Sequence, residues 1–189
     1  MLAGAAPAPA QRALGTSPRD ARQFDESFRK YTKRFFGAGY DWRLFKAQAM
    51  AESGLDAEAH SRSGARGLMQ LMPSTFAEIQ SRNPELTSIN DPEWNIAAGI
   101  QYDRMLWNLW KEQPADPDRR SFMFGSYNAG RRTILRAQEM ARRDSLDGLK
   151  WVSIEAVAPR VQGWRHLETL GYVGKIGINL AALLVNGPP

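Results

Sequence analysis

The sequence predicts a mainly α-helical protein with a single domain. Apolar residues recur at spacings of three and four along most of the chain, and no run alternates as a β-strand would. A chain of 189 residues is long enough to bury one substantial core. There is no cysteine and histidine occurs only twice, so packing rather than disulfides or a metal must hold the fold.

The first residues differ in composition from the rest of the chain. Residues 1–17 are rich in alanine, proline and glycine and show almost no periodicity, which predicts a disordered leader. The helical pattern begins near residue 18, so we assign a single domain to residues 18–189. A secretory signal would need a basic segment followed by a longer apolar run, and neither is clear.

Two helices are expected in the N-terminal part of the domain. In the first, apolar residues recur at spacings of four and three, at Phe24, Phe28 and Tyr31, and a glycine-containing segment follows. Asp41 starts the second helix, which carries Glu52 near its end.

Proline marks the starts of the next two helices. Pro73 and Ser74 open a short helix that continues to about Gln80. Asp91 is a helix cap, and Pro92 occupies the first position of a long helix. Four residues share one face of that long helix: Gly99, Tyr102, Leu106 and Trp110.

The C-terminal part predicts four more helices. Asp116 and Pro117 start one that leads to Tyr127, and Gly130 permits the turn into another. The stripe of that following helix contains Ile134, Ala137, Gln138 and Ala141. A short helix is expected near Ser153, and a last one runs from about Glu168. Its apolar stripe contains Val173, Ile176, Leu180 and Leu183.

Glu52 stands out because it ends an otherwise apolar helix face formed by Trp42, Phe45 and Ala49. Gly54 can take the left-handed conformation that ends a helix, so Glu52 would lie in the last turn, where the macrodipole disfavours a negative charge. We expect a raised pKa, which a general acid requires. The alternative from local spacing is a solvated or salt-bridged surface carboxylate.

A glycine-rich loop and two later motifs accompany Glu52. Residues 52–54 read Glu-Ser-Gly, and residues 61–73 read Ser-x-x-Gly-Ala-x-Gly-Leu-Met-Gln-Leu-Met-Pro. Residues 126–130 read Ser-Tyr-Asn-Ala-Gly, and residues 165–173 supply Arg, Glu-Thr and Tyr-Val elements. This ordered set resembles the soluble lytic transglycosylases of bacteria and phages, which cleave peptidoglycan on a goose-type lysozyme fold.

The resemblance extends over about residues 24–176, and Asp41-Trp42-Arg43-Leu44 is similar to the membrane-bound lytic transglycosylase F subgroup. Ser126 stands where alanine is usual, and His166 where glycine is usual. These departures put the local shape near Tyr127 and Tyr172 in doubt. Residues 144–162 match least well.

Glycoside cleavage usually employs two carboxylates, but only Glu52 lies inside a motif. Asp56 and Glu58 read as exposed loop residues, and Asp91 and Glu93 as charges at a helix start. The resemblance implies that Glu52 alone suffices. It would protonate the glycosidic oxygen and then deprotonate the C6 hydroxyl of the same N-acetylmuramoyl residue, which gives a 1,6-anhydro product.

The resemblance also implies a set of substrate-binding residues: Ser53, Ser61, Gln70, Met72, Tyr127, Asn128 and Tyr172. Tyr172 would hydrogen-bond Glu52, while Met72 and Tyr127 would form apolar walls against the sugars. Each has a structural alternative. Ser53 could bond back to its own helix, Ser61 and Gln70 could cap the loop, and Met72 could belong to the core.

Composition limits the partners. The formal net charge of +5 and the pI of about 9.7 favour an anionic partner. Bacterial cell wall fits that charge. The basic residues are scattered and no nucleic-acid motif is present, so we expect peptidoglycan glycan strands as the partner and no nucleic acid. We also expect a monomer without cofactor or metal, acting in the cell envelope.

No stretch reaches the about 20 apolar residues of a membrane span, so no transmembrane segment is expected. Two functional alternatives remain open. A lysozyme on the same fold would use water in place of the C6 hydroxyl and leave reducing ends. A wall-binding or virion structural module would bind glycan without cleaving it.

Overall fold

The protein is mainly helical in the part that the computed structural model describes, residues 22–113 and 116–186. In this part the backbone forms isolated β-bridges but no strand. This confirms the mainly α fold class. The predicted leader, residues 1–17, lies outside the described residues. The helices are α1 (Asp25–Phe36), α2 (Arg43–Glu52), α3 (Pro73–Gln80), α4 (Pro92–Leu109), α5 (Asp118–Ala129), α6 (Arg131–Arg143), α7 (Trp151–Val157), the short 3-10 helix η2 (Ala158–Arg160) and α8 (His166–Asn186).

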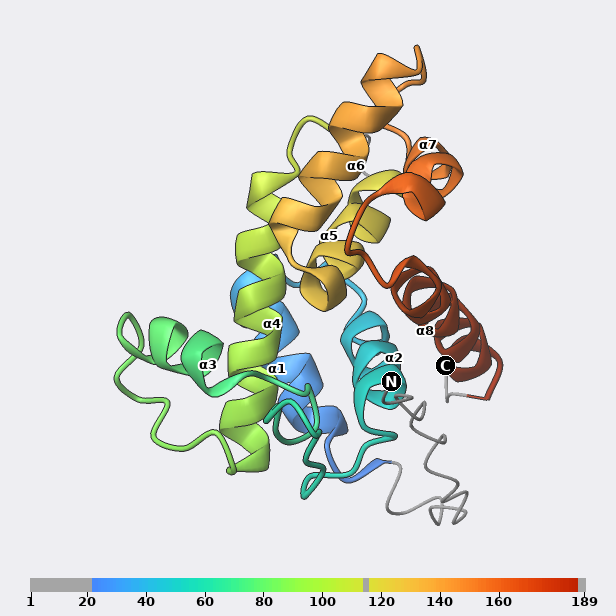
Figure 1. The fold of residues 1–189 in the computed structure, drawn as a ribbon. Helices are drawn as coiled ribbons and strands as arrows, with labels where there is room; N and C mark the ends of the chain where they lie inside the picture. The colour runs from blue at the N-terminus through green and yellow to red at the C-terminus, as the bar shows by residue number, and fades with distance from the viewer. Residues whose placement is uncertain (1–21, 114–115, 187–189) are drawn as a thin grey trace.

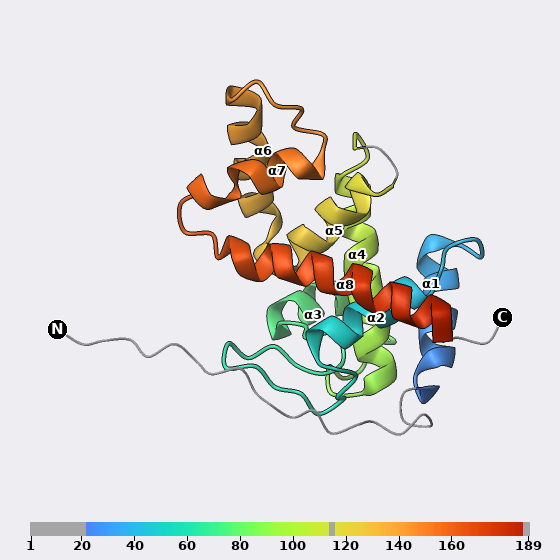
Figure 2. The ribbon, with the colours of Figure 1, turned by 90° about the vertical axis from the view of Figure 1, so that its right-hand side faces the viewer.

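The long helix α4 runs through the middle of the molecule (Figure 1). It packs against α1, α3 and α5, while α8 lies alongside both α2 and α5 (Figure 2). One core lies among these helices, and a second lies among α5, α6, α7 and the segment before α8. The two cores meet along α5, which therefore joins the halves of the fold.

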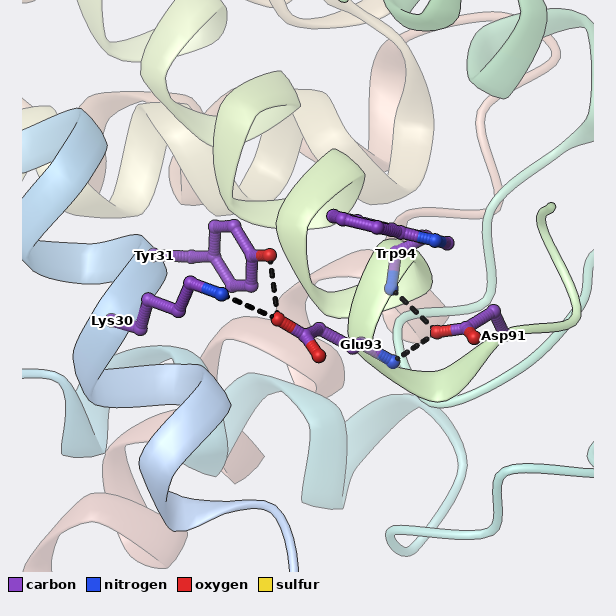
Figure 3. Close-up of polar contacts among 5 residues, drawn as sticks. All are labelled: Lys30, Tyr31, Asp91, Glu93 and Trp94. Carbon is purple, nitrogen blue, oxygen red and sulfur yellow. Dashed lines mark hydrogen bonds and ion pairs between the residues drawn. The ribbon is translucent and has the colours of Figure 1, made fainter. Parts of the chain in front are cut away.

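The start of α4 shows how sequence signals set the helix boundaries. The Asp91 carboxylate accepts hydrogen bonds from the backbone N–H groups of Glu93 and Trp94, and Pro92 occupies the first turn (Figure 3). The Glu93 carboxylate in turn accepts hydrogen bonds from Lys30 and Tyr31 of α1 (Figure 3). These contacts fix α1 beside the start of α4.

Most predicted helices are confirmed, with small shifts at their ends. The second helix starts at Arg43, two residues later than predicted. The Asp41 carboxylate lies before the helix and accepts a hydrogen bond from the Arg43 N–H. The short helix after the loop starts at Pro73 with Met72 as its N-cap, so Ser74 is inside the helix and does not cap it. In α6, the predicted stripe is buried as expected: Ile134, Ala137, Gln138 and Ala141.

Helix α8 differs from the prediction in the extent of its burial. Of its predicted stripe only Ile176 is fully buried, and Val173, Leu180 and Leu183 are partly buried. Its segment His166–Val185 is long and apolar enough to cross a membrane by length and composition alone, which the sequence prediction missed by considering only its C-terminal end. Only 17% of this segment is buried, because α8 packs one face against α2 and α5 and leaves Leu167, Ile178 and Val185 exposed.

Candidate active site

Glu52 is the last residue of α2, as the sequence predicts. Ser53 caps the helix with its backbone N–H, and Gly54 follows with φ of +68°. That left-handed conformation turns the chain away from the helix axis and leaves the Glu52 side chain at the helix end. The carboxyl is half-buried, facing α8 and the interior of the fold.

The environment of Glu52 favours its protonated form. Burial is the main cause that raises the pKa of Glu52, to about 7 from an ordinary value of 4.5. Hydrogen bonding from Tyr172 and the charge of Lys175 lower this pKa, and the charge of Glu168 raises it. A carboxyl that titrates near neutral pH can both give up and take back a proton.

Helix α8 supplies the groups around this carboxyl, and two of its side chains hold α2 in place. Lys175 and Asn179, one turn apart, donate hydrogen bonds to the backbone carbonyls of Ala51 (3.3 Å) and Ala47 (3.0 Å) of α2. The two helices lie side by side in this region (Figure 2). The position of Glu52 is therefore set by contacts between α2 and α8.

Tyr172 of α8 is buried among the core residues and faces Glu52. Burial raises the pKa of Tyr172 far above its usual range, so the phenol stays protonated. Its hydroxyl has no hydrogen bond of ordinary geometry within the described residues, although it is close enough to influence Glu52.

Asn95 of α4 fixes the loop after α2 through side-chain hydrogen bonds to its backbone. The Asn95 side chain is buried, accepts a hydrogen bond from Met69 N–H, and donates to the carbonyls of Arg66 and Ile89. A Cβ on Gly67 would lie 2.6 Å from the Asn95 amide, and Gly67 has φ of +72°. Only glycine fits this position, which explains one small residue of the loop motif.

Ser53, Ser61 and Gln70 make hydrogen bonds that shape this loop. The Ser53 hydroxyl donates to Ala49 of its own helix and, at 2.9 Å, to the Leu68 carbonyl. The Ser61 hydroxyl accepts from the Ala65 N–H. The Gln70 amide donates to carbonyls within the loop, and its backbone has φ of +45°. Ser53 thus bonds to its own helix, and Ser61 and Gln70 bond within the loop, which are the structural roles that the sequence left open for them.

Tyr127 contacts the loop from α5, and Met72 lies where the loop meets α3. The Tyr127 hydroxyl donates to the Met69 carbonyl at 2.8 Å, and its ring packs on Tyr102 of α4. Burial raises the pKa of Tyr127 well above its usual range, and the charge of Glu52 adds to this effect. Met72 is 40% exposed at the N-cap of α3, so it is not a core residue.

A cavity of about 190 Å³ lies between the end of α5 and the start of α8. Asn128 lines it, and its side-chain carbonyl accepts a hydrogen bond from the Thr169 hydroxyl, which accepts one from the Trp164 indole N–H. Arg165 and Glu168 form an ion pair at its edge. The charge of Glu168, which lines this cavity, raises the pKa of Glu52.

The two departures from the family motifs have local explanations. Ser126 is fully buried, and its hydroxyl accepts a hydrogen bond from the Trp110 indole at 2.9 Å. The serine at this position therefore links α5 to Trp110 at the end of α4. His166 begins α8 and its ring lies edge-on to Trp164.

The other carboxylates that sequence reasoning weighed lie elsewhere. Asp56 and Glu58 are exposed on the loop, while Asp91 and Glu93 hold the start of α4. A buried carboxyl that sequence reasoning missed is Asp103 of α4, which is close enough to Glu52 for their charges to interact. Within the described residues, no cluster of three or more histidine, aspartate or glutamate side chains is arranged to hold a metal ion.

Comparison with known proteins decides the family. The family model described as the transglycosylase SLT domain matches residues 28–147, more than half of the chain. The chain belongs to the transglycosylase SLT domain family. Curated relatives include the membrane-bound lytic murein transglycosylase F of Ectopseudomonas mendocina (strain ymp), 29% identical over 158 residues that cover 80% of this chain and 31% of the relative. The corresponding protein of Maricaulis maris (strain MCS10) is 30% identical over 158 residues, covering 82% and 34%.

Solved structures confirm the fold of this SLT domain. The 70 kDa soluble lytic transglycosylase of Escherichia coli superimposes with a TM-score of 0.65 at 24% identity, covering 87% of this chain and 24% of that one. A complex of the 70 kDa soluble lytic transglycosylase with bulgecin A gives a TM-score of 0.63 at 23% identity, covering 90% and 25%. The chain spans about a third of the length of the curated relatives above.

Proposed function

We propose that this chain is a peptidoglycan lytic transglycosylase. It cleaves the β-1,4 bond between N-acetylmuramoyl and N-acetylglucosamine residues and leaves a 1,6-anhydromuramoyl end. One observation carries the proposal: the half-buried carboxyl of Glu52, with a pKa of about 7, stands at the end of α2 within the SLT domain. A group with this pKa can act as acid and base in turn near neutral pH.

In the first half of the reaction, Glu52 gives its proton to the glycosidic oxygen as the bond from C1 to that oxygen breaks. Burial raises the pKa enough for a large share of the carboxyl to be protonated near neutral pH. Positive charge then develops at C1, and the new Glu52 carboxylate lies close to it. The charge of Lys175 and hydrogen bonding from Tyr172 both favour this carboxylate.

In the second half, the C6 hydroxyl of the same muramoyl residue attacks C1. Its proton passes to Glu52, a new bond forms between O6 and C1, and the carboxyl returns to its starting state. The nucleophile is part of the substrate, so its effective concentration is high and no bound water is needed. This is why a single carboxylate suffices, where a two-carboxylate glycosidase would need a second.

The surrounding residues bind and orient the glycan in this proposal. Met72 is exposed and Tyr127 is half-buried, and they offer apolar surface to sugar rings. Asn128 lines the cavity beside Glu168 and offers an amide to an N-acetyl group. Ser53, Ser61 and Gln70 contribute by holding the loop in shape, as their hydrogen bonds indicate.

Digestion of purified peptidoglycan tests the proposal through the chemistry of the ends that are released. Anhydromuramoyl ends support the transglycosylase. Reducing muramoyl ends would keep Glu52 as the acid but assign the chain to hydrolytic lysozymes on the same fold. Binding of glycan without any release would favour a wall-binding or virion structural module.

The site of action in this proposal is the cell envelope, where the glycan strands lie. The relatives' name, membrane-bound lytic murein transglycosylase F, supports this assignment. We also propose that the chain acts as a monomer, binds no nucleic acid, requires no cofactor or metal, and does not use α8 as a membrane span.

A further inference from the structure

A second carboxyl is buried behind Glu52, and the proposed reaction does not use it. Asp103 of α4 and Gln48 of α2 are both 0% exposed. The Gln48 amide nitrogen donates a hydrogen bond to Asp103 Oδ1 at 3.4 Å. Gln48 lies four residues before Glu52 on α2, so it belongs to the helix turn that precedes the acid.

The second oxygen of Asp103 and the side-chain oxygen of Gln48 both lack a hydrogen-bond donor among the described residues. These atoms, Asp103 Oδ2 and Gln48 Oε1, are both buried. If Asp103 were ionised, both atoms would be acceptors and neither could satisfy the other. If Asp103 carries a proton on Oδ2, that hydroxyl can donate to Gln48 Oε1, and the acid and amide satisfy each other through two hydrogen bonds.

The charges around the pair also favour a neutral Asp103. Burial is the main cause that raises the pKa of Asp103 well above its usual range, and the charge of Glu52 raises it further. In the described part of the chain, the other titratable groups that interact with Asp103 are phenols, and none of the interacting groups is a cation: Tyr40, Tyr102, Tyr127 and Tyr172. A buried carboxylate without a cation is costly, so the proton remains.

Other groups around Glu52 come from α5 and α8. Glu168, Tyr172 and Lys175 of α8 face it, as does Tyr127 of α5. Of these, only Lys175 is a cation, and its side chain reaches the end of α2 at Ala51 rather than Asp103. Lys175 therefore balances the Glu52 carboxylate and leaves Asp103 without a counter-ion.

We propose that Asp103 and Gln48 form a neutral acid–amide pair that positions the last turn of α2, and that Asp103 keeps its proton while Glu52 loses and regains its own. The second half of this statement rests on the proposed function. A carboxylate at Asp103 would repel the Glu52 carboxylate that must form during the reaction. The neutral pair joins α4 to α2 without adding that charge. Asp103 and Gln48 are thus positioning residues and do not touch the substrate.

Infrared spectroscopy tests the protonation state without any reference to activity. The difference spectrum is recorded between Glu52→Gln and Glu52→Gln/Asp103→Asn at about pH 8, where ordinary carboxyls are ionised. We expect the C=O stretch of a protonated carboxylic acid, lost on Asp103→Asn. A carboxylate band lost in its place would overturn the proposal. The result is readable even if the chain proves to have no lytic activity.

The pH profile of cleavage tests the effect on Glu52. Gln48→Glu creates two carboxyls that share one proton and carry one negative charge, which should move the alkaline limb of kcat/KM up by about one pH unit. Adding Asp103→Asn restores an acid–amide pair with the partners exchanged, so the limb should return toward its wild-type position. If the alkaline limb of kcat/KM stayed at its wild-type pH in Gln48→Glu, with both variants folded, the proposal would be contradicted.

Two substitutions at Asp103 separate positioning from charge. Asp103→Asn retains two hydrogen bonds to Gln48 and should keep kcat and the pH profile of the wild type. Asp103→Leu leaves the Gln48 amide unpaired and should lower kcat by roughly ten- to a hundredfold with KM little changed, because the acid is misplaced. Wild-type kcat in a folded Asp103→Leu variant, or a limb that moves down in Asp103→Asn, would overturn the proposal.

Discussion

Replacing Glu52 with glutamine should make the protein more stable at neutral and alkaline pH, and this gain follows directly from the buried carboxyl. The folded state raises the pKa of Glu52 to about 7, against 4.5 for an unperturbed glutamate. Below about pH 4.5 the group is protonated in both states and contributes nothing. Between these two values the folded state binds the extra proton, so stability falls as pH rises, and above about pH 7 the whole penalty is present.

The magnitude follows from the width of that window. A difference of about 2.5 pH units, at about 1.4 kcal/mol per unit, gives a penalty of about 3 kcal/mol in the free energy of unfolding. Glu52→Gln keeps the shape and removes the charge. It should therefore raise the stability by up to about 3 kcal/mol at about pH 8, or roughly 6–12 °C in Tm, and by nothing at about pH 4.

Thermal and urea unfolding at both pH values measure this effect. Glu58→Gln is the matched control, because Glu58 is an exposed carboxylate on the loop that follows the same helix. The control should change little at either pH. If Glu52→Gln were no more stable than wild type near pH 8, the folded state would not disfavour the carboxylate. The proposal that burial raises the pKa of Glu52 and so makes it a general acid would then be refuted.

Three further predictions concern the site and its support. Tyr172→Phe removes a group that lowers the pKa of Glu52, so the alkaline limb of kcat/KM should move to higher pH and turnover should fall; an unchanged profile would return Tyr172 to a purely structural role. Lys175→Met should move the same limb in the same direction, by less because Lys175 is exposed; a downward shift would contradict its assigned effect. Asn95→Leu leaves three backbone groups unpaired, two in the loop and one at Ile89, and should destabilise the fold by about 3 kcal/mol in urea unfolding, whereas Asp91→Ala, which removes only a helix cap, should cost about 1 kcal/mol; equal costs would contradict this ranking.

The helices were predictable because their signals are local. Asp91 and Pro92 mark the start of α4 within two residues, and Gly54 marks the end of α2. Both signals act through the backbone of neighbouring residues, so they do not depend on the rest of the fold. Burial along α8 was less predictable, because its apolar residues exceed the surface that α2 and α5 cover.

The same distinction applies to the site. Glu52 could be found from the sequence because an apolar helix face, a helix end and a motif coincide at one residue. The effects of Lys175 and Glu168 on its pKa could not, because both residues reach it from the far end of the chain. Asp103 was missed because its partner Gln48 lies 55 positions away. The available signal was a polar residue on the buried face of each of two helices.

For the loop, motif membership did not reveal what each side chain contacts. Ser61 and Gln70 match family positions, yet their observed hydrogen bonds are within the loop. Asn95 was not singled out, although it binds the backbone at Met69 and Arg66 from a different helix. Such contacts join segments far apart in the sequence, and only the folded chain brings them together.

The most direct test of the central claim is mass spectrometry of the fragments that the protein releases from purified peptidoglycan, with Glu52→Gln measured in parallel. We predict anhydromuramoyl ends from the wild-type protein and no release by the variant, since the amide cannot give a proton to the glycosidic oxygen. Release by Glu52→Gln at the wild-type rate would contradict the assignment of Glu52. Reducing ends from the wild type would contradict the transglycosylase reaction.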